Sequence, residues 1–250
     1  AGSEMSNSCV ITNEEGWYKK ALDTDLARPK FAIMNPEITY TLPDYQTQCG
    51  CADIMMHTME RYFVLEDTME ITDKIAQDVM KNVMKYAKIL KKDPENYEAR
   101  AEIMWCGSLS HNGLTGCGTC GGDWATHLIE HELGGMFDVA HGAGLAAVWG
   151  SWARYVMDEK PERFAQFAVD VMGVEESDDV KSTALKGIEA VEEFYRMIEM
   201  PTNMKELGID PTDEQIKDMA MKATNHDTQQ LGAFKKLSAK DLVEIYKTAK

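Results

Sequence analysis

The sequence has no apolar run long enough to cross a membrane as a helix, and no basic segment followed by an apolar one at its start, as a secretory signal would have. It is also poor in positive charge, because 26 lysines and arginines stand against 42 aspartates and glutamates, giving a formal net charge of -16. An acidic surface repels phosphate backbones. We therefore expect a cytoplasmic protein that binds neither membranes nor nucleic acid.

Cysteine is scarce as well, with 6 residues in 250. A chain of this size, 44% hydrophobic, can build a core without disulfides, so reduced thiols are expected. Cys117 and Cys120 have the CxxC spacing of a zinc or iron–sulfur ligand pair, but no second CxxC occurs and the surrounding glycines indicate a loop. A cysteine-based metal or redox site is therefore disfavoured.

Few helix signals occur in the first 42 residues. Residues 8–13 and 30–34 are short and apolar enough to form strands, and Asn35-Pro36 would end the second strand. From Pro43 onward the pattern changes to one helix after another. The sequence predicts an all-α, multi-helix bundle over residues 43–250, preceded by a short extended lead-in over residues 1–42.

The clearest amphipathic stripe runs through residues 72–92, where apolar side chains recur every three or four positions. Thr72 or Asp73 is the expected N-cap of this helix, and Asp93-Pro94 would end it. Further helices are expected over residues 161–172, from Pro161; over about 177–200; over about 212–223, opened by the capping box Thr212-x-x-Gln215; and from Ser238 through Tyr246.

Histidine and acidic residues form two clusters that suggest a metal site. Asp53 and His57 are four residues apart, which places both on one face of a helix and allows both to reach one ion. His127, His131 and His141 lie within fifteen positions of one another, which is hard to explain as core packing alone. One carboxylate and several imidazoles suit Fe²⁺, Zn²⁺, Ni²⁺ or Co²⁺, and the ligand types do not choose among these metals.

His141 can join the other histidines only if the chain turns back. Along one straight helix His127 and His141 would be roughly 21 Å apart at 1.5 Å per residue. Gly134-Gly135 permits a turn, so we expect the helix to break there and His141 to open the next apolar segment.

These residues bear a resemblance to a known family. The chain resembles the iron-containing (group III) alcohol dehydrogenases, especially the butanol dehydrogenase-like branch, and the resemblance runs over nearly all of the sequence. The segments that carry it are residues 2–6 (GSEMS), 29–43, 53–63 (DIMMHTMERYF), 122–131 (GDWATHLIEH), 137–142 (FDVAHG) and 234–246.

The resemblance implies that Asp53, His57, His127 and His141 bind a divalent metal, with Fe²⁺ the leading candidate and Zn²⁺ or Ni²⁺ as alternatives. His131 would lie beside the metal as a catalytic proton-relay residue, without binding it. Lys19 occupies the position at which the family often has a lysine near the cofactor.

The resemblance also implies a reaction, the interconversion of a small alcohol and an aldehyde with NAD(P)H. In this family an α/β nucleotide-binding domain with a Gly-rich phosphate loop precedes the helical domain. These 250 residues contain no Gly-x-Gly-x-x-Gly after a strand. We therefore expect residues 1–42 to be a linker or remnant of that domain and residues 43–250 to be the helical metal-binding domain. The isolated chain is expected to be inactive, and a homodimer is compatible with it.

Two alternatives stay open at this point. His127, Glu130 and His131 match the His-x-x-Glu-His arrangement of a zinc metallopeptidase, in which the glutamate activates water. The chain could also be a non-catalytic metal-binding helical domain that assembles with a partner. His111 and His226 match no ligand position, and we expect both to be ordinary core or surface residues.

Overall fold

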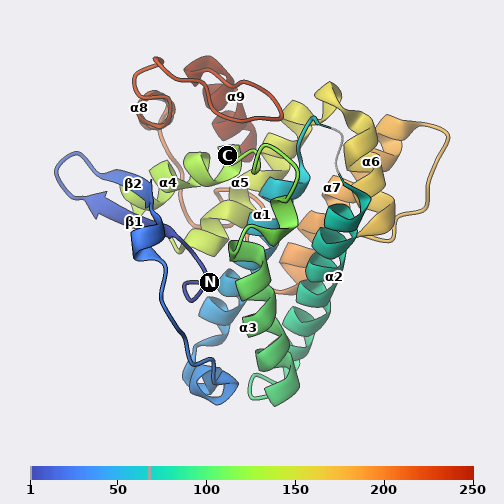
Figure 1. Ribbon diagram of the computed structural model, residues 1–250. Coiled ribbons are helices and arrows are strands. Elements are labelled where there is room, and N and C mark those ends of the chain that lie inside the picture. Colours follow the sequence, from blue (N-terminus) through green and yellow to red (C-terminus); the bar gives the residue numbers. More distant parts are fainter. Residues whose placement is uncertain (1, 67–68) are drawn as a thin grey trace.

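The computed structural model of the chain describes residues 2–66 and 69–250. In this part of the chain a hairpin of two strands, β1 (Ser8–Asn13) and β2 (Tyr18–Asp23), is followed by a helical bundle (Figure 1), which confirms the predicted all-α class. The α-helices are α1 (Asp44–Tyr62), α2 (Glu70–Lys92), α3 (Tyr97–His111), α4 (Ala125–Phe137), α5 (His141–Val156), α6 (Pro161–Asp170), α7 (Val180–Met197), α8 (Asp213–Ala223) and α9 (Ala239–Ala249).

The bundle is organised around α5, which contacts α1, α4, α7 and α9 and is buried along nearly its whole length. Its two tryptophans, Trp149 and Trp152, pack on an aromatic cluster with Phe63 and Phe164, whose stacked ring centroids lie 4.4 Å apart. This cluster forms the centre of the hydrophobic core.

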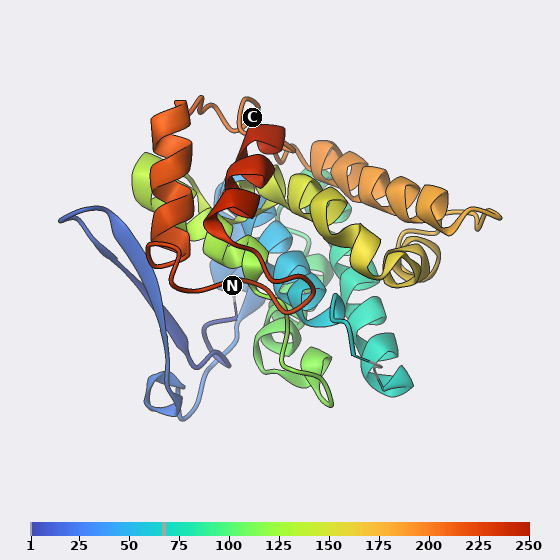
Figure 2. The ribbon, with the colours of Figure 1, turned by 90° about the horizontal axis from the view of Figure 1, so that it is seen from above.

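Three pairs of helices complete the bundle. α2 packs on α3, α6 packs on α7, and α8 packs on α9. Seen from above (Figure 2), the hairpin lies on the opposite side of the molecule from α6 and α7. Among the described residues, no helix has the length and apolarity that crossing a membrane would require.

The hairpin corrects one prediction. β1 forms where it was expected, but its partner is β2, in a register that pairs Ser8 with Asp23 and Asn13 with Tyr18. The strand predicted over residues 30–34 is wrong, because residues 31–35 have no regular structure and the Phe31 side chain is exposed. An apolar run forms a strand only where a partner strand reaches it. The short turn containing Gly16, whose φ is +87°, brings residues 18–23 back to β1.

Several helix ends agree with the sequence signals, but the start of α2 does not. The capping boxes Thr212 with Gln215 and Ser238 with Asp241 are both formed, and Pro161 is in the first turn of α6. α2 begins at Glu70, so neither Thr72 nor Asp73 caps it. Instead, the Thr72 hydroxyl donates to the carbonyl oxygen of Cys117 at 3.0 Å, and Asp73 forms an ion pair with Arg163.

The predicted helix break at Gly134-Gly135 is also wrong. α4 runs through both glycines, and the chain turns at Asp138, whose φ is +52°. The glycines let the hairpin approach α4: a Cβ atom at Gly135 would lie 2.8 Å from the carbonyl oxygen of Trp17, and one at Gly134 would lie 2.4 Å from Lys19 Nζ. The turn therefore exists as expected, four residues further along the chain.

Candidate metal centre

Three helices bring the predicted ligands together. α1 carries Asp53 and His57 on successive turns, α4 carries His127, and His141 is the first residue of α5. The N-terminus of α5 lies directly against α1, since a Cβ atom at Gly142 would be 2.0 Å from the carbonyl oxygen of Cys49. Only glycine permits this approach, and it places His141 opposite Asp53.

The four side chains surround one carboxylate oxygen. Asp53 Oδ1 lies 3.6 Å from His57 Nε2, 3.8 Å from His127 Nε2 and 3.5 Å from His141 Nε2. These separations exceed a good hydrogen bond. Two ligands on one tetrahedral ion, each with a bond of about 2.1 Å, lie roughly 3.4 Å apart. Each of these histidines therefore lies at about the spacing from Asp53 Oδ1 that two ligands of one cation have, and ligand atoms of Asp53, His127 and His141 lie within 4.8 Å of one another.

Two glutamates orient two of these histidines. Glu60 Oε1 accepts hydrogen bonds from both the backbone N–H and Nδ1 of His127, each at 3.0 Å, and Glu130 Oε2 contacts Nδ1 of His141. Because these carboxylates hold Nδ1, Nε2 is the nitrogen of each ring that faces Asp53. A carboxylate behind a histidine is the usual partner of a metal-binding imidazole.

The donor set therefore fits a divalent metal. His127 Nε2 is buried and has no hydrogen-bond partner among the described residues. Sequence reasoning missed the role of Glu60. Its only signal was its position seven residues after Asp53, two helical turns along the same face of α1.

The buried titratable groups of this site shift one another's pKa values. Burial alone would raise the pKa of Asp53, but His57, His127 and His141 hold it well below its usual value. Burial holds the pKa of His57 well below its usual value, although Asp53 opposes this shift. Burial would likewise lower the pKa of His127, but the neighbouring carboxylates of Asp53 and Glu60 raise it to about 9.

His131 and Lys19 lie next to this group. The His131 ring centroid is 5.7 Å from that of His141, and burial, followed by the neighbouring histidines, lowers the pKa of His131 to about 3. Ligand atoms of Glu130, His131 and His141 lie within 4.8 Å of one another. Lys19 Nζ, on β2, is 3.7 Å from Glu130 Oε2. His131 is thus beside the site and outside the group around Asp53, where the resemblance had suggested it.

His111 departs from its expected place. Its Nε2 lies 3.9 Å from Asp53 Oδ2, and its ring lies against that of His57 with centroids 3.7 Å apart. No spacing in the sequence links His111 to either cluster, because it comes from α3 and meets them only through helix packing. His226, by contrast, is exposed after α8.

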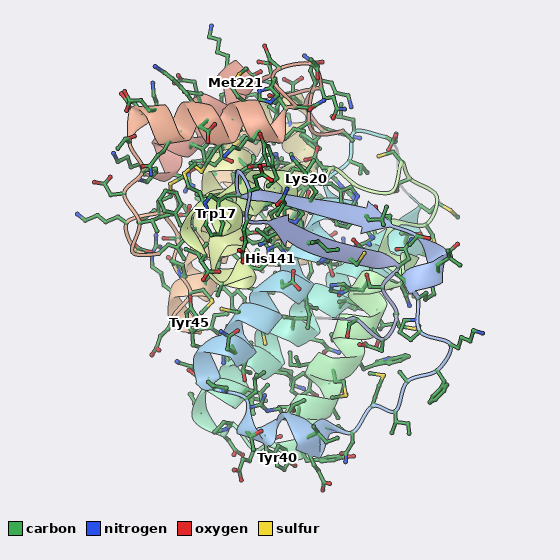
Figure 3. All side chains as sticks on the ribbon, turned by 90° about the vertical axis from the view of Figure 1, so that its left-hand side faces the viewer. Trp17, Lys20, Tyr40, Tyr45, His141 and Met221 are labelled. Atoms are coloured by element: carbon green, nitrogen blue, oxygen red, sulfur yellow. The ribbon has the colours of Figure 1, made fainter. Side chains whose placement is uncertain are left out.

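A cleft of about 550 Å³ opens beside the centre. Its lining includes Asp53, His141 and Cys49, with Glu4 and Arg100 as further charged groups. The side chain of His141 is 33% exposed, whereas that of His127 is 7% exposed. Figure 3 shows His141 between the hairpin and the helices below it. A small molecule could therefore approach the centre from the side of His141.

Comparison with known proteins identifies relatives of this arrangement. A family model described as "Fe-containing alcohol dehydrogenase family, C-terminal" matches residues 47–250. NADH-dependent butanol dehydrogenase A of Clostridium acetobutylicum is 34% identical over 98% of this chain and 63% of its own length. The NADPH-dependent aldehyde reductase YqhD of Escherichia coli is 32% identical over 100% of this chain and 63% of its own length.

Solved structures agree with the sequence matches. The crystal structure of NADH-dependent butanol dehydrogenase A from Thermotoga maritima superimposes on the whole chain with a TM-score of 0.92 and 34% identity. The match covers 63% of that protein. The chain thus spans less than two thirds of the length of the relatives it matches.

Proposed function

The chain belongs to the Fe-containing alcohol dehydrogenase family, and on that premise we propose that it carries the metal centre of an enzyme that interconverts small alcohols and aldehydes with NADH or NADPH. The observation that carries this proposal is the convergence of three imidazole Nε2 atoms on Asp53 Oδ1 at 3.5–3.8 Å. The relatives, an NADH-dependent butanol dehydrogenase and an NADPH-dependent aldehyde reductase, suggest the substrate class and both forms of the nicotinamide cofactor.

We assign Asp53, His57, His127 and His141 as the metal ligands, with Fe²⁺ as the first candidate and Zn²⁺ or Ni²⁺ as alternatives. A divalent ion held there supplies Lewis acidity toward the oxygen of an alcohol or aldehyde. Glu60 and Glu130 hold the His127 and His141 rings in the tautomer that presents Nε2.

The residues around the ligands have separate tasks in this proposal. The cleft beside His141 would hold the substrate next to the metal ligands. A nicotinamide cofactor would supply the hydride chemistry. His131, next to His141, passes the alcohol proton between the site and water. Lys19, close to Glu130, contributes a positive charge near the bound cofactor.

Metal content tests the ligand assignment. The protein, purified without oxygen, should contain close to one equivalent of iron, zinc or nickel, and His127→Ala should contain little. His226→Ala changes an exposed histidine and is the matched control. Equal metal in all three proteins would refute the site.

Activity separates this proposal from the zinc peptidase suggested by His127, Glu130 and His131. Reduction of a short-chain aldehyde by NADH or NADPH, followed in the intact protein, should disappear in Asp53→Ala. A peptidase would need Glu130 to activate water, yet this carboxylate contacts His141 and lies 3.7 Å from Lys19. Peptide hydrolysis that Glu130→Gln abolishes, together with unchanged aldehyde reduction in Asp53→Ala, would reverse the assignment.

A further inference from the structure

We propose that His111 is a fifth protein ligand of the metal, in addition to the four groups assigned above. The inference rests on the proposed metal centre and extends it. His111 is the last residue of α3, a helix that contributes none of the other ligands, and its side chain is 5% exposed. It therefore lies in the buried part of the centre, away from the exposed edge of His141.

The hydrogen bonds of His111 determine which nitrogen faces the centre. Nδ1 lies 2.9 Å from the carbonyl oxygen of Gly107 and 2.7 Å from Ser110 Oγ. A carbonyl oxygen only accepts, so Nδ1 must carry the proton and donate it. Nε2 is then unprotonated, and its lone pair is available to a metal ion. An imidazole whose Nδ1–H donates to a backbone carbonyl is a common metal-binding arrangement.

The Nε2 atom of His111 lies near the Asp53 carboxylate. His111 Nε2 lies 3.9 Å from Asp53 Oδ2, and both side chains are buried. Two ligands that bind one ion, each with a bond of about 2.1 Å, can lie up to roughly 4.2 Å apart, so Nε2 and this carboxylate can share a cation. Glu60 and Glu130 hold Nδ1 of His127 and of His141 in the same way. Helices α3, α4 and α5 therefore each present an Nε2 atom to Asp53.

His111 forms a ligand set with two of the four assigned groups, Asp53 and His57. Single ligand atoms of Asp53, His57 and His111 lie within 4.8 Å of one another, as do those of Asp53, His127 and His141. Asp53 belongs to both sets. The His57 and His111 rings are tilted by 34° with their centroids 3.7 Å apart, so one nitrogen of each ring can bind the same ion.

The test uses the Zn²⁺-loaded protein with isotope-labelled histidine and detects the ring nitrogens by NMR. We expect zinc to shift one ring nitrogen each of His57, His127, His141 and His111, with elemental analysis giving one zinc per chain. In His111→Gln the fourth shift should vanish and zinc affinity, measured by competition with a chelator, should fall at least about tenfold, the lower end of the loss for an outer-shell partner. His226→Gln is the control, and His111→Asn replaces His111→Gln if that variant does not fold.

The outcomes separate the two proposals. Zinc shifts at His57, His127 and His141 without one at His111 would overturn the fifth ligand and leave the centre intact. Two zinc ions per chain would also overturn it, since His57 and His111 would then hold an ion of their own with Asp53. No zinc-induced shift at any histidine would refute the metal centre itself.

Discussion

Two buried aspartates on neighbouring helices have opposite surroundings. Asp73, on α2, receives two short hydrogen bonds from the Arg163 guanidinium, at 2.6 and 2.7 Å. Arg163 also donates to the carbonyl oxygen of Tyr62 and lies over its ring, 3.6 Å from the centroid. These contacts are at hydrogen-bond or van der Waals distance. Arg163 thus balances the charge of Asp73 directly.

The carboxylate of Asp53, on α1, has ring nitrogens of four histidines around it, at distances of 3.5–3.9 Å. Both regions border a hollow, of about 470 Å³ beside Asp73 and about 550 Å³ beside Asp53. The hollow alone therefore does not distinguish a functional site. The difference is that one carboxylate is matched closely by its partner, whereas the other is surrounded by donors at the spacing of a shared ion.

The largest effect is expected from removing the Asp73 carboxylate, which is paired with Arg163. Asp73→Ala leaves the Arg163 charge buried and uncompensated, which should lower the free energy of unfolding by about 3–5 kcal/mol. Metal affinity should stay the same, because the pair does not belong to the centre. Urea denaturation measures the first quantity, and chelator competition measures the second.

Asp78→Ala is the matched control for that variant. Asp78 lies on the same helix, is 79% exposed and pairs loosely with Lys81 at 3.7 Å. An exposed pair of this kind contributes about 0–1 kcal/mol, so unfolding should change little. Equal losses in Asp73→Ala and Asp78→Ala would mean that the buried pair has no special structural role.

A smaller effect is expected from Glu60→Gln, which changes the electrostatics of the metal centre and keeps its shape. The glutamine oxygen can still accept from both nitrogens of His127, so the fold should be retained. Loss of the negative charge makes the imidazole a weaker base, and metal affinity should fall about 10- to 100-fold. Chelator competition with Zn²⁺ measures the change, and Glu70→Gln, in the exposed first turn of α2, is the control. Unchanged affinity in Glu60→Gln would show that Glu60 only packs against His127.

The sequence predicted those parts of the centre that depend on local spacing. Asp53 and His57, four residues apart, were correctly placed on one helix, and the return of His141 was expected from the distance along a straight helix. The position of the turn was wrong, because Gly134-Gly135 suggests a break as readily as a close approach of another segment. Here the approach of the hairpin decides, and α4 continues through both glycines.

The groups that were missed come from contacts that periodicity cannot reveal. His111 is on α3 and Glu60 is on α1, and each reaches the centre only because particular helix faces meet. A hydrophobic pattern tells which face of a helix is buried, but it does not tell which other helix covers it. The same limit explains the strand predicted over residues 30–34, whose apolar side chains have no partner strand.

The smallest effects concern two glycines with different roles at the centre. A methyl group at Gly142 would meet the backbone of Cys49 at 2.0 Å, so Gly142→Ala must push α5 away from α1. Such overpacking costs about 1–3 kcal/mol. At Gly134 the nearest atoms are Lys19 Nζ and Glu130 Oε1, ends of side chains that can move. Replacing a glycine inside a helix by alanine gains roughly 0.5–1 kcal/mol, so Gly134→Ala should leave stability nearly unchanged.

Thermal unfolding distinguishes the two glycine variants, since 1 kcal/mol corresponds to about 2–4 °C in a chain of this size. Gly142→Ala should also weaken metal binding, because the displaced helix carries His141 with it. Gly134→Ala should keep the metal, because the closest contact, at 2.4 Å, is with the mobile end of Lys19, whereas Glu130 Oε1 lies at 3.0 Å and need shift only slightly. If both variants bind metal as tightly as the unaltered protein, the close contact of α5 with α1 serves packing alone, and His141 does not depend on it for its position opposite Asp53.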